Sequence, residues 1–211
     1  MALTPSLSRP AGEGEDRQYE KKQLRTFLRD RRRTLSPAEV TEKSRRVTER
    51  LFAFTPFQQA RTLVLYSANE NEVQTEAIWQ EASTQGKAVY YPRITADRAN
   101  LEFVRRHPGD RLLPGVFGIL IPPGEDLLIG LRETDVVLTP GVGFDRQGHR
   151  LGRGKGYYDR AFRGVLSGGL RVALAYEFQV VPHIPAASND EGVQYIVTEA
   201  EPIGYSDKNP L

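Results

Sequence analysis

Short apolar runs that alternate with helix-length segments are the feature that most constrains the fold of this chain. The runs occupy residues 63–66, 88–91, 135–139, 171–176 and 195–197, with a weaker one at 101–105. Strands this short and this apolar are typical of a sheet that helices cover on both faces. The pattern therefore predicts an α/β fold of three layers, with a mostly parallel central sheet flanked by helices.

Two helices are predicted before the first strand, and we expect this N-terminal helical pair to be antiparallel. The first runs from Arg17 to Arg33. The second begins at Ser36, where the order Ser-Pro-Ala-Glu supplies a capping serine, a proline suited to the first turn and, at Glu39, the acid of a capping box. It continues to Pro56. The residues predicted to face the core are Leu24, Phe27, Leu28, Val40, Ser44, Val47 and Leu51.

Proline and glycine mark the predicted ends of helices and strands in the rest of the chain. A helix is predicted from Thr75, as its cap, to Ser83, and Gly86 should end it. Its inward residues are Ile78, Trp79 and Ala82. Pro92 should stop the strand at 88–91, and residues 108–130 should carry little regular structure. A last helix is expected at residues 156–166.

Composition excludes several classes of protein. The chain has 211 residues and no cysteine, which excludes disulfides, zinc–thiolate sites, iron–sulfur clusters and cysteine nucleophiles. No apolar run reaches the roughly 18 residues of a membrane span, and the N-terminus lacks the apolar core of a signal peptide. We expect a soluble cytoplasmic protein with one catalytic domain at residues 17–205, a disordered tail at 1–16 and a short C-terminal tail at 206–211.

Basic residues are concentrated near the N-terminus. Residues 17–61 hold 13 lysines and arginines against 5 acidic residues, although the net charge of the whole chain is only +2. Such a block suggests an anionic partner, which could be a nucleic acid, a nucleotide or an anionic substrate, or else a solvated helical face.

The loop at residues 139–160, between a predicted strand and a predicted helix, is the most informative segment. Its centre reads Arg150-Leu151-Gly152-Arg153-Gly154-Lys155-Gly156. Glycine lets a backbone turn its N–H groups toward a ligand, and the helix start adds positive charge to that of the three cations. The loop therefore predicts a phosphate site where open α/β sheets bind ligands. The glycine spacing matches neither a Walker A loop nor the dinucleotide fingerprint, and a tight structural turn is the alternative.

The run GFDRQGHRLGRGKGYYDR at 143–160 resembles the signature of the 5-formyltetrahydrofolate cyclo-ligase family, also called methenyltetrahydrofolate synthetases. Shorter pieces resemble the family in the same order, namely Lys21-Lys22-Gln23-Leu24-Arg25, Tyr66 with Glu72-Val73-Gln74-Thr75, Pro92-Arg93, and Asn189-Asp190. The resemblance extends over residues 17–200. The chain departs from the family at Ile121, where glutamate is common, and at Gln194, where an acid is common.

The resemblance implies an ATP- and Mg²⁺-dependent ring closure that converts 5-formyltetrahydrofolate and ATP to 5,10-methenyltetrahydrofolate, ADP and phosphate. In the family's scheme the formyl oxygen takes the γ-phosphoryl group, N10 attacks the activated carbon, and phosphate leaves. Because the folate supplies both nucleophiles, the protein needs mainly to position reactants and neutralise charge. The implied partners are these small molecules and Mg²⁺, and we expect a monomer that binds neither nucleic acid nor a membrane.

The resemblance also implies the residues of the site. ATP would be bound by Lys21, Arg25, Arg150, Leu151, Gly152, Arg153, Gly154, Lys155, Gly156, Tyr157 and Tyr158, with Arg150, Arg153 and Lys155 catalytic. The folate would be bound by Tyr66, Glu72, Arg153, Gly154, Lys155, Gly156 and Tyr157. Asp159 and Asp190 would hold Mg²⁺, which prefers oxygen ligands.

Without the family, simpler interpretations stay open. The two cations of the first helix could be ordinary surface charges, Asp159 a stabilising charge at a helix start, and Asp190 part of an Asx turn. Glu72 could be a solvated loop acid, and Tyr66 a core aromatic. Two other functions also remain, namely a sugar-phosphate enzyme that uses the same loop, and a nucleic-acid-binding relative without catalysis, which the basic block would favour.

Overall fold

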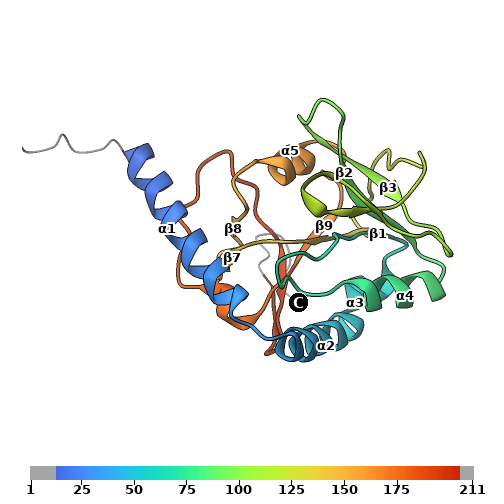
Figure 1. The fold of residues 1–211 in the computed structure, drawn as a ribbon, viewed down its shortest axis with the longest axis horizontal. Coiled ribbons are helices and arrows are strands. Elements are labelled where there is room, and N and C mark those ends of the chain that lie inside the picture. Colours follow the sequence, from blue (N-terminus) through green and yellow to red (C-terminus); the bar gives the residue numbers. More distant parts are fainter. Residues whose placement is uncertain (1–12, 205–211) are drawn as a thin grey trace, which may run out of the picture.

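A seven-stranded sheet forms the centre of the structure, a computed structural model that describes residues 13–204. Its strand order is β12-β11-β9-β6-β1-β2-β3. Figure 1 labels β9, β1, β2 and β3 of this sheet. The five inner strands run parallel, and the two edge strands pair antiparallel with their neighbours. The strands are β1 (Thr62–Val64), β2 (Ala88–Ile94), β3 (Leu101–Arg105), β6 (Val136–Thr139), β9 (Leu170–Leu174), β11 (Tyr195–Val197) and β12 (Pro202–Gly204).

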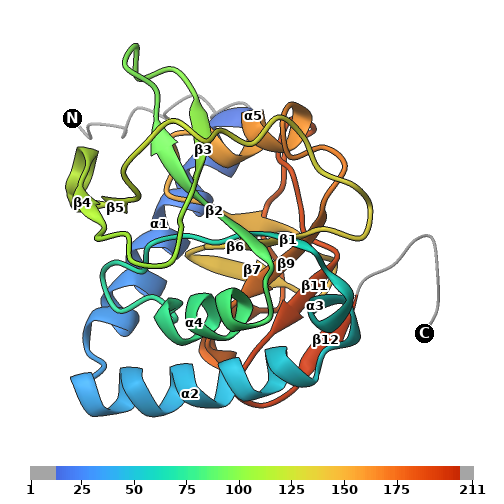
Figure 2. The same cartoon turned by 90° about the vertical axis from the view of Figure 1, so that its right-hand side faces the viewer.

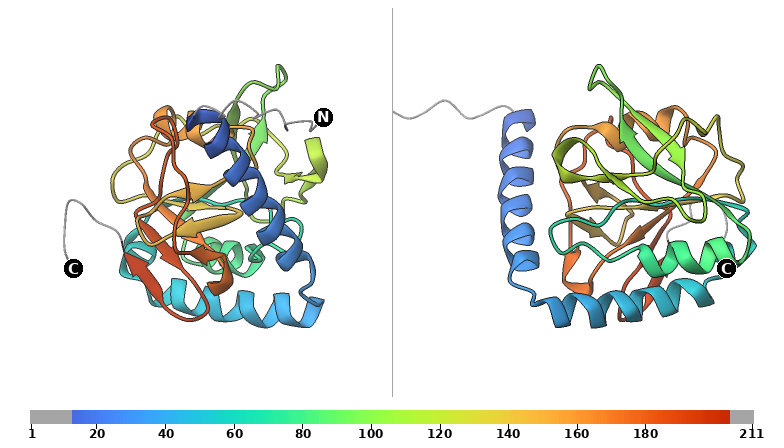
Figure 3. Two further views of the ribbon diagram at one scale, coloured as in Figure 1. Left: turned by 90° about the vertical axis from the view of Figure 1, so that its left-hand side faces the viewer. Right: turned by 45° about the vertical axis from the view of Figure 1, so that its right-hand side comes forward.

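Helices cover both faces of this sheet, which confirms the predicted three-layer α/β class. The helices α2 (Pro37–Ala53), α3 (Thr55–Gln59) and α4 (Glu76–Thr84) lie on one face (Figure 2). The short helix α5 (Tyr157–Arg163) lies on the other. The long helix α1 (Glu13–Arg33) stands beside the body of the protein (Figure 3). No helix within residues 13–204 is long and apolar enough to cross a membrane.

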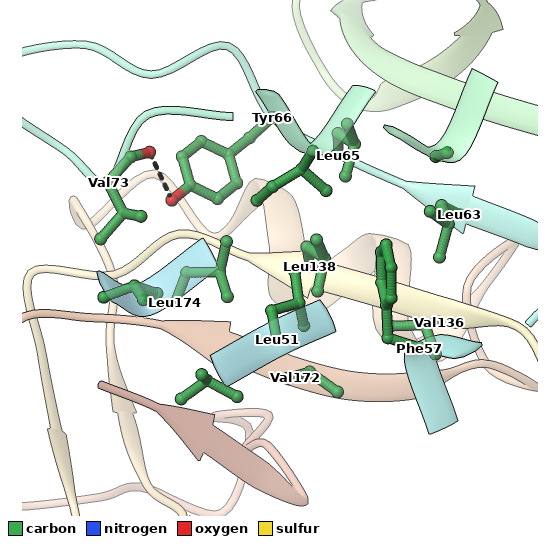
Figure 4. Packing of buried hydrophobic residues seen from close by; sticks show 14 of the residues in the cluster. Leu51, Phe57, Leu63, Leu65, Tyr66, Val73, Val136, Leu138, Val172 and Leu174 are labelled. Atoms are coloured by element: carbon green, nitrogen blue, oxygen red, sulfur yellow. Dashed lines mark hydrogen bonds between the residues drawn. The ribbon is translucent and has the colours of Figure 1, made fainter. Parts of the chain in front are cut away.

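Alternation along the buried strands divides the core into two apolar layers. Leu63 and Leu65 point toward α2–α4, where they pack with residues such as Leu51 and Phe57 (Figure 4). Val64, between them, points to the opposite face and packs near Phe162 of α5. Since successive side chains of a strand point to opposite faces, a fully apolar run serves both layers.

Two smaller sheets were not expected from the sequence. One has the order β10 (Val180–Val181), β7 (Gly143–Asp145) and β8 (Arg150–Leu151), and the other pairs β4 (Leu113–Pro114) with β5 (Leu120–Ile121). Strands of two or three residues among glycines and prolines carry no apolar periodicity that could reveal them. The hairpin of β7 and β8 lies within the glycine-rich loop and so fixes the start of that loop.

The helical pair differs from its prediction. α1 begins at Glu13, so that residues 13–16, predicted to be a disordered tail, are helical. The rest of that tail, residues 1–12, and the C-terminal tail at 206–211 lie outside the described residues. α1 and α2 are not antiparallel neighbours, because the chain turns a corner at Ser36 (Figure 3). The capping box at Ser36 and Glu39 is confirmed.

The buried face of α1 explains this arrangement. Leu28 packs in a cluster with Leu151 of β8 and with Val142 and Ile184, which lie in loops beside the small sheet. Phe27, predicted to face inward, is 61% exposed. The spacing therefore identified an amphipathic helix correctly but not the surface against which it packs.

Two local predictions were wrong for identifiable reasons. β2 continues through Pro92 to Ile94. The carbonyl of Tyr90 accepts a hydrogen bond from the backbone N–H of Leu65, so the backbone groups of Tyr90 face β1. Every second residue of a strand faces the same neighbour, so the nitrogen of Pro92 also faces β1. The pairing of β1 ends at Tyr90, and the missing N–H of Pro92 therefore costs no hydrogen bond of the sheet. Thr75 does not cap α4 with its side chain, because its hydroxyl donates to the carbonyl of Tyr66 at 2.7 Å.

Asp135 directly precedes β6 and bonds to the first residues of β1 and β9, and its charge should contribute to stability. Its buried carboxylate accepts hydrogen bonds from the backbone of Thr62 at 3.1 Å and of Arg132 at 2.9 Å. Burial alone would raise the pKa of Asp135, but hydrogen bonds from Arg132 and Thr62 and the Arg132 charge hold it below the usual 3.8. We expect Asp135→Asn to lower the free energy of unfolding by about 2 kcal/mol at pH 7.

Comparison of the wild type with Asp135→Asn also tests the sign of the pH dependence of stability. Because the pKa of Asp135 is depressed in the folded state, its contribution is full above the unfolded pKa and is lost as the pH falls through the folded one. The difference between wild type and Asp135→Asn in urea unfolding should therefore shrink below about pH 4. The exposed neighbour Glu133 serves as control, since Glu133→Gln should have little effect at either pH. A constant difference down to low pH would contradict the prediction.

Candidate functional site

A cavity of about 850 Å³ opens at the carboxyl ends of the parallel strands. Its walls include Tyr66, which follows β1, Arg93 near the end of β2, and Pro140, which follows β6. In a parallel sheet these ends lie at one edge, which is the usual ligand position in open α/β folds. The glycine-rich loop, α1 and the loop around Asp190 complete the enclosure.

All fifteen residues predicted for the site line this one cavity. They are Lys21, Arg25, Tyr66, Glu72, Arg150, Leu151, Gly152, Arg153, Gly154, Lys155, Gly156, Tyr157, Tyr158, Asp159 and Asp190. Of the two adjacent lysines in the first helix, Lys21 is buried, whereas Lys22 is exposed. The cavity brings the predicted residues together, and the role of each remains a prediction.

The glycine-rich loop presents free backbone N–H groups. Within the described part of the chain, the N–H groups of residues 152–156 donate no hydrogen bond. Gly154 and Gly156 have φ angles of +95° and +68°, which turn the backbone in directions that other residues rarely adopt. Unpaired amides of this kind form an anion-binding concavity. The alternative of a tight turn closed on its own hydrogen bonds does not fit these residues.

Arg150 and Asp159 form a largely buried ion pair at the base of the loop. An Nη2–Oδ1 distance of 2.6 Å joins them, and the same Oδ1 accepts a bond from the backbone of Glu191 at 3.1 Å. Burial lowers the pKa of Arg150, while the carboxylates of Asp159 and Asp190 act in the opposite direction. The guanidinium therefore feels the charge of both acids of the site.

Helix α1 reaches the cavity through two basic side chains four residues apart. Lys21 is ion-paired with Asp190, whose carboxylate also accepts a bond from the backbone of Ala187 at 2.7 Å. Arg25 donates from Nε to the carbonyl of Gly152 at 2.8 Å. These contacts place both predicted ATP-binding cations of α1 against the glycine-rich loop and the loop around Asp190.

Glu72 is a buried acid rather than a solvated one. It is 8% exposed, and its Oε1 accepts a hydrogen bond from Arg153 at 2.8 Å. Its Oε2 accepts a bond from the backbone of Asn69 at 3.1 Å. Tyr66 is both a core aromatic and a lining residue, and its hydroxyl donates to the carbonyl of Val73 at 3.0 Å. Burial raises the pKa of Tyr66 well above its usual value, so its hydroxyl stays protonated.

The carboxylates of Asp159 and Asp190 fit a magnesium ion. Asp159 Oδ2 and Asp190 Oδ1 make no hydrogen bond within residues 13–204, which leaves one oxygen of each carboxylate available. The described residues hold no cluster of three or more potential metal ligands. Mg²⁺ commonly takes only one or two protein carboxylates and completes its shell with water and phosphate, so this donor set is sufficient.

An apolar wall of the cavity escaped the sequence analysis. The segment between β4 and β5 contributes Val116, Phe117 and Ile119, and Ile121 follows within β5. Phe117 is 63% exposed, which is unusual for a large aromatic side chain. Apolar residues framed by prolines in a segment without periodicity were the only signal in the sequence. The lining of the cavity therefore combines an apolar surface with charged residues.

Positive charge dominates the lining of the cavity. Eight lysines and arginines line it against four carboxylates. Three of the cations, Arg93, Arg160 and Arg163, were not assigned to the site from the sequence, although Arg93 belongs to the Pro-Arg pair noted there. A cavity with this excess attracts a ligand that carries several negative charges.

Comparisons with known proteins match most of the chain. The family model described as 5-formyltetrahydrofolate cyclo-ligase family matches residues 17–199. A mouse 5-formyltetrahydrofolate cyclo-ligase is 31% identical over 192 residues, which are 86% of this chain and 95% of that protein. A protein of the same name from Escherichia coli K12 is 30% identical over 179 residues, which are 83% of this chain and 98% of that one.

Solved structures agree on the fold. The 5,10-methenyltetrahydrofolate synthetase of Aquifex aeolicus superposes with a TM-score of 0.77 at 31% identity, covering 90% of this chain and 95% of that one. A 5,10-methenyltetrahydrofolate synthetase from Mycoplasma pneumoniae, at 23% identity, gives a TM-score of 0.67 and covers 85% of this chain and 99% of that one.

Gly154 provides a test of the anion-binding loop. An added Cβ would meet only the Arg25 side chain, at an ordinary 3.8 Å, so the cost of Gly154→Ala comes from its φ of +95°. We expect the loop to shift and the affinity for inorganic triphosphate, measured by calorimetry, to fall about tenfold. Gly130→Ala is the control, because nothing lies near its Cβ position and its φ is not positive. Equal affinities in the two variants would exclude these amides as the anion site.

Proposed function

The chain belongs to the 5-formyltetrahydrofolate cyclo-ligase family, and on this premise we propose that it closes 5-formyltetrahydrofolate to 5,10-methenyltetrahydrofolate with hydrolysis of ATP to ADP and phosphate. Ligase activity in folate metabolism is what the family and its named members indicate. The dependence on ATP and Mg²⁺, the mechanism and the roles of single residues are the proposal. A cytoplasmic location and a monomeric state stay predictions from the sequence.

The observation that carries the proposal is the cavity with two unlike sides. Free amides at 152–156 lie among Lys21, Arg25, Arg150 and Arg153, which suits a triphosphate. The segment around Phe117 adds an apolar wall to the same cavity, which suits a flat aromatic ring system. Two ligands of these kinds, bound side by side, are the reactants of the proposed reaction.

The proposed reaction has two steps that need charge neutralisation. The formyl oxygen of the folate attacks the γ-phosphorus, and ADP leaves. N10 then attacks the activated formyl carbon and loses its proton, and phosphate leaves as the new C–N bond closes the ring. We assign Arg150, Arg153 and Lys155 to the stabilisation of negative charge on the transferring phosphoryl group. No protein nucleophile takes part.

Magnesium would be held by Asp159 and Asp190. Bound there, the ion would supply further positive charge to the phosphate oxygens. Because Lys21 and Arg150 now pair with these acids, both cations would become available to the phosphates as the carboxylates turn to the metal. The residues of the site would in this way exchange partners without any change in their total charge.

Glu72 and Tyr66 are assigned to the folate side. A carboxylate can accept paired hydrogen bonds from the amino and ring N–H groups of a pterin. Glu72 is buried at the cavity wall, so such bonds would form away from bulk water, where they are stronger. Tyr66 supports the same wall through its bond to Val73.

The basic block at residues 17–61 gives little support to nucleic-acid binding. Its cations Lys21, Arg29, Arg32, Arg33, Lys43 and Arg45 are ion-paired within the chain. Cations that are committed to internal acids contribute less to a phosphate-binding surface. The alternative of a nucleic-acid-binding relative is therefore not favoured.

Turnover provides the direct test of the proposed function. Purified protein mixed with 5-formyltetrahydrofolate, ATP and Mg²⁺ should give the near-ultraviolet absorbance of 5,10-methenyltetrahydrofolate. We expect the signal to vanish when ATP is omitted or when a chelator removes the metal. Absorbance that appears without nucleotide, or never appears, would disprove the proposal.

Two substitutions test the site itself. Arg150→Ala and Asp159→Ala should each reduce kcat about 100-fold, because each removes charge from the phosphoryl-transfer side. Arg146→Ala is the matched control, since this exposed arginine of the same loop lies outside the cavity lining and should leave the rate unchanged. Normal rates in both site variants would remove the assignment of the site.

A further inference from the structure

Arg32 is a buried cation of α1 that lies outside the set of residues assigned to the reaction. Its side chain is 2% exposed and is among the largest fully buried side chains of the described residues. A buried guanidinium is costly unless hydrogen bonds and opposite charge surround it. The groups that bond to Arg32 therefore indicate which part of the structure this side chain stabilises.

The contacts of Arg32 converge on the turn that precedes Glu72. Its Nε donates to the carbonyl of Glu70 at 2.9 Å, and its Nη1 donates to the carbonyl of Gly141 at 3.3 Å. The side-chain amide of Asn71 donates back to the carbonyl of Arg32 at 3.1 Å. Arg32 and Asn71 thus join α1 to the turn in both directions.

This turn has an unusual backbone. Glu70 and Asn71 have φ angles of +49° and +60°, which place two consecutive residues other than glycine in the left-handed region. Such residues persist only where the surroundings hold them. The bonds to Arg32 supply that support, and Glu72 follows directly after the turn.

Glu72 lies between two guanidinium groups. Arg153 contacts its Oε1 at 2.8 Å from the cavity side, where its side chain is 41% exposed. Arg32 approaches the same oxygen at 3.7 Å from the buried side. Burial lowers the pKa of Arg32, and the charge of Glu72 is the largest influence in the opposite direction.

We propose that Arg32 is a positioning residue for Glu72. It holds the left-handed turn that aims this carboxylate at the cavity, and it remains the counter-charge of Glu72 when Arg153 turns to a phosphate. Without Arg32, the buried carboxylate of Glu72 would have no cationic partner once Arg153 binds a phosphate. The inference rests on the proposed function, because it assigns Glu72 to folate binding.

Arg33 offers a matched control on the same helix. It contacts the Glu70 carboxylate at 3.1 Å, but its side chain is 53% exposed and it makes none of the backbone contacts of Arg32. Loss of Arg33 removes a cation from the same turn without removing its support. Arg32→Met and Arg33→Met therefore separate positioning from simple charge.

The first experiment needs no ligand. The amide of Glu72 donates to the carbonyl of Asn69 at 3.0 Å, so its hydrogen exchange reports on the turn. We expect Arg32→Met to speed this exchange about tenfold relative to the amide of Leu65 in the core, and Arg33→Met to change it less than about twofold. The exchange rates of the Glu72 and Leu65 amides could instead rise equally, both in Arg32→Met and in the milder Arg32→Lys. Arg32 would then be merely structural, and the proposal would fail.

The second experiment measures binding of 5-formyltetrahydrofolate and of a non-hydrolysable ATP analogue. Arg32→Met should weaken the folate about tenfold and leave the affinity for the analogue within about twofold. On a Glu72→Gln background, Arg32→Met should cause no further loss. If the losses of folate affinity from Arg32→Met and Glu72→Gln instead multiply in the double variant, the proposal is overturned. A wild-type protein that binds no folate would instead refute the proposed function, and the exchange result would still decide the role of Arg32.

Discussion

Parallel strand pairing is the constraint on which the rest of this structure depends. β1 pairs in parallel with both β2 and β6, and β6 pairs in parallel with β9, so these strands end at the same edge. Segments that are far apart in the sequence, such as the turn before Glu72 and the glycine-rich loop, therefore meet above that edge. α1 closes the site from outside through Lys21 and Arg25.

Charge pairing is the second organising principle of the site. Each carboxylate of the cavity wall has a basic partner within the chain, as in the pairs Arg150–Asp159, Lys21–Asp190 and Arg153–Glu72. Pairing limits the cost of placing charge in a partly buried site. A ligand that brings both phosphates and a divalent cation can replace these internal partners on both sides, which supports a metal-bound nucleotide as the occupant.

The predictions succeeded where the chemistry is local and failed where it is not. The capping box at Ser36 was recognisable because its two hydrogen bonds join residues three positions apart. Pro92 was misjudged as a strand end, since only the register of β1 shows that its nitrogen faces no partner. Phe117 was missed because its segment has no periodicity, and Arg32 because nothing distinguishes it in sequence from the exposed arginines beside it.

The sequence by itself determined the α/β class, the glycine-rich loop and the family resemblance that named the site residues, because apolar periodicity, glycine content and motif spacing are properties of neighbouring residues. Tertiary structure decided which surfaces those elements meet. It alone set α1 against the cavity, buried Arg32 behind Glu72 and paired each acid with its cation. These are contacts between segments up to 169 residues apart, and their geometry follows from packing and strand register, which no local pattern encodes.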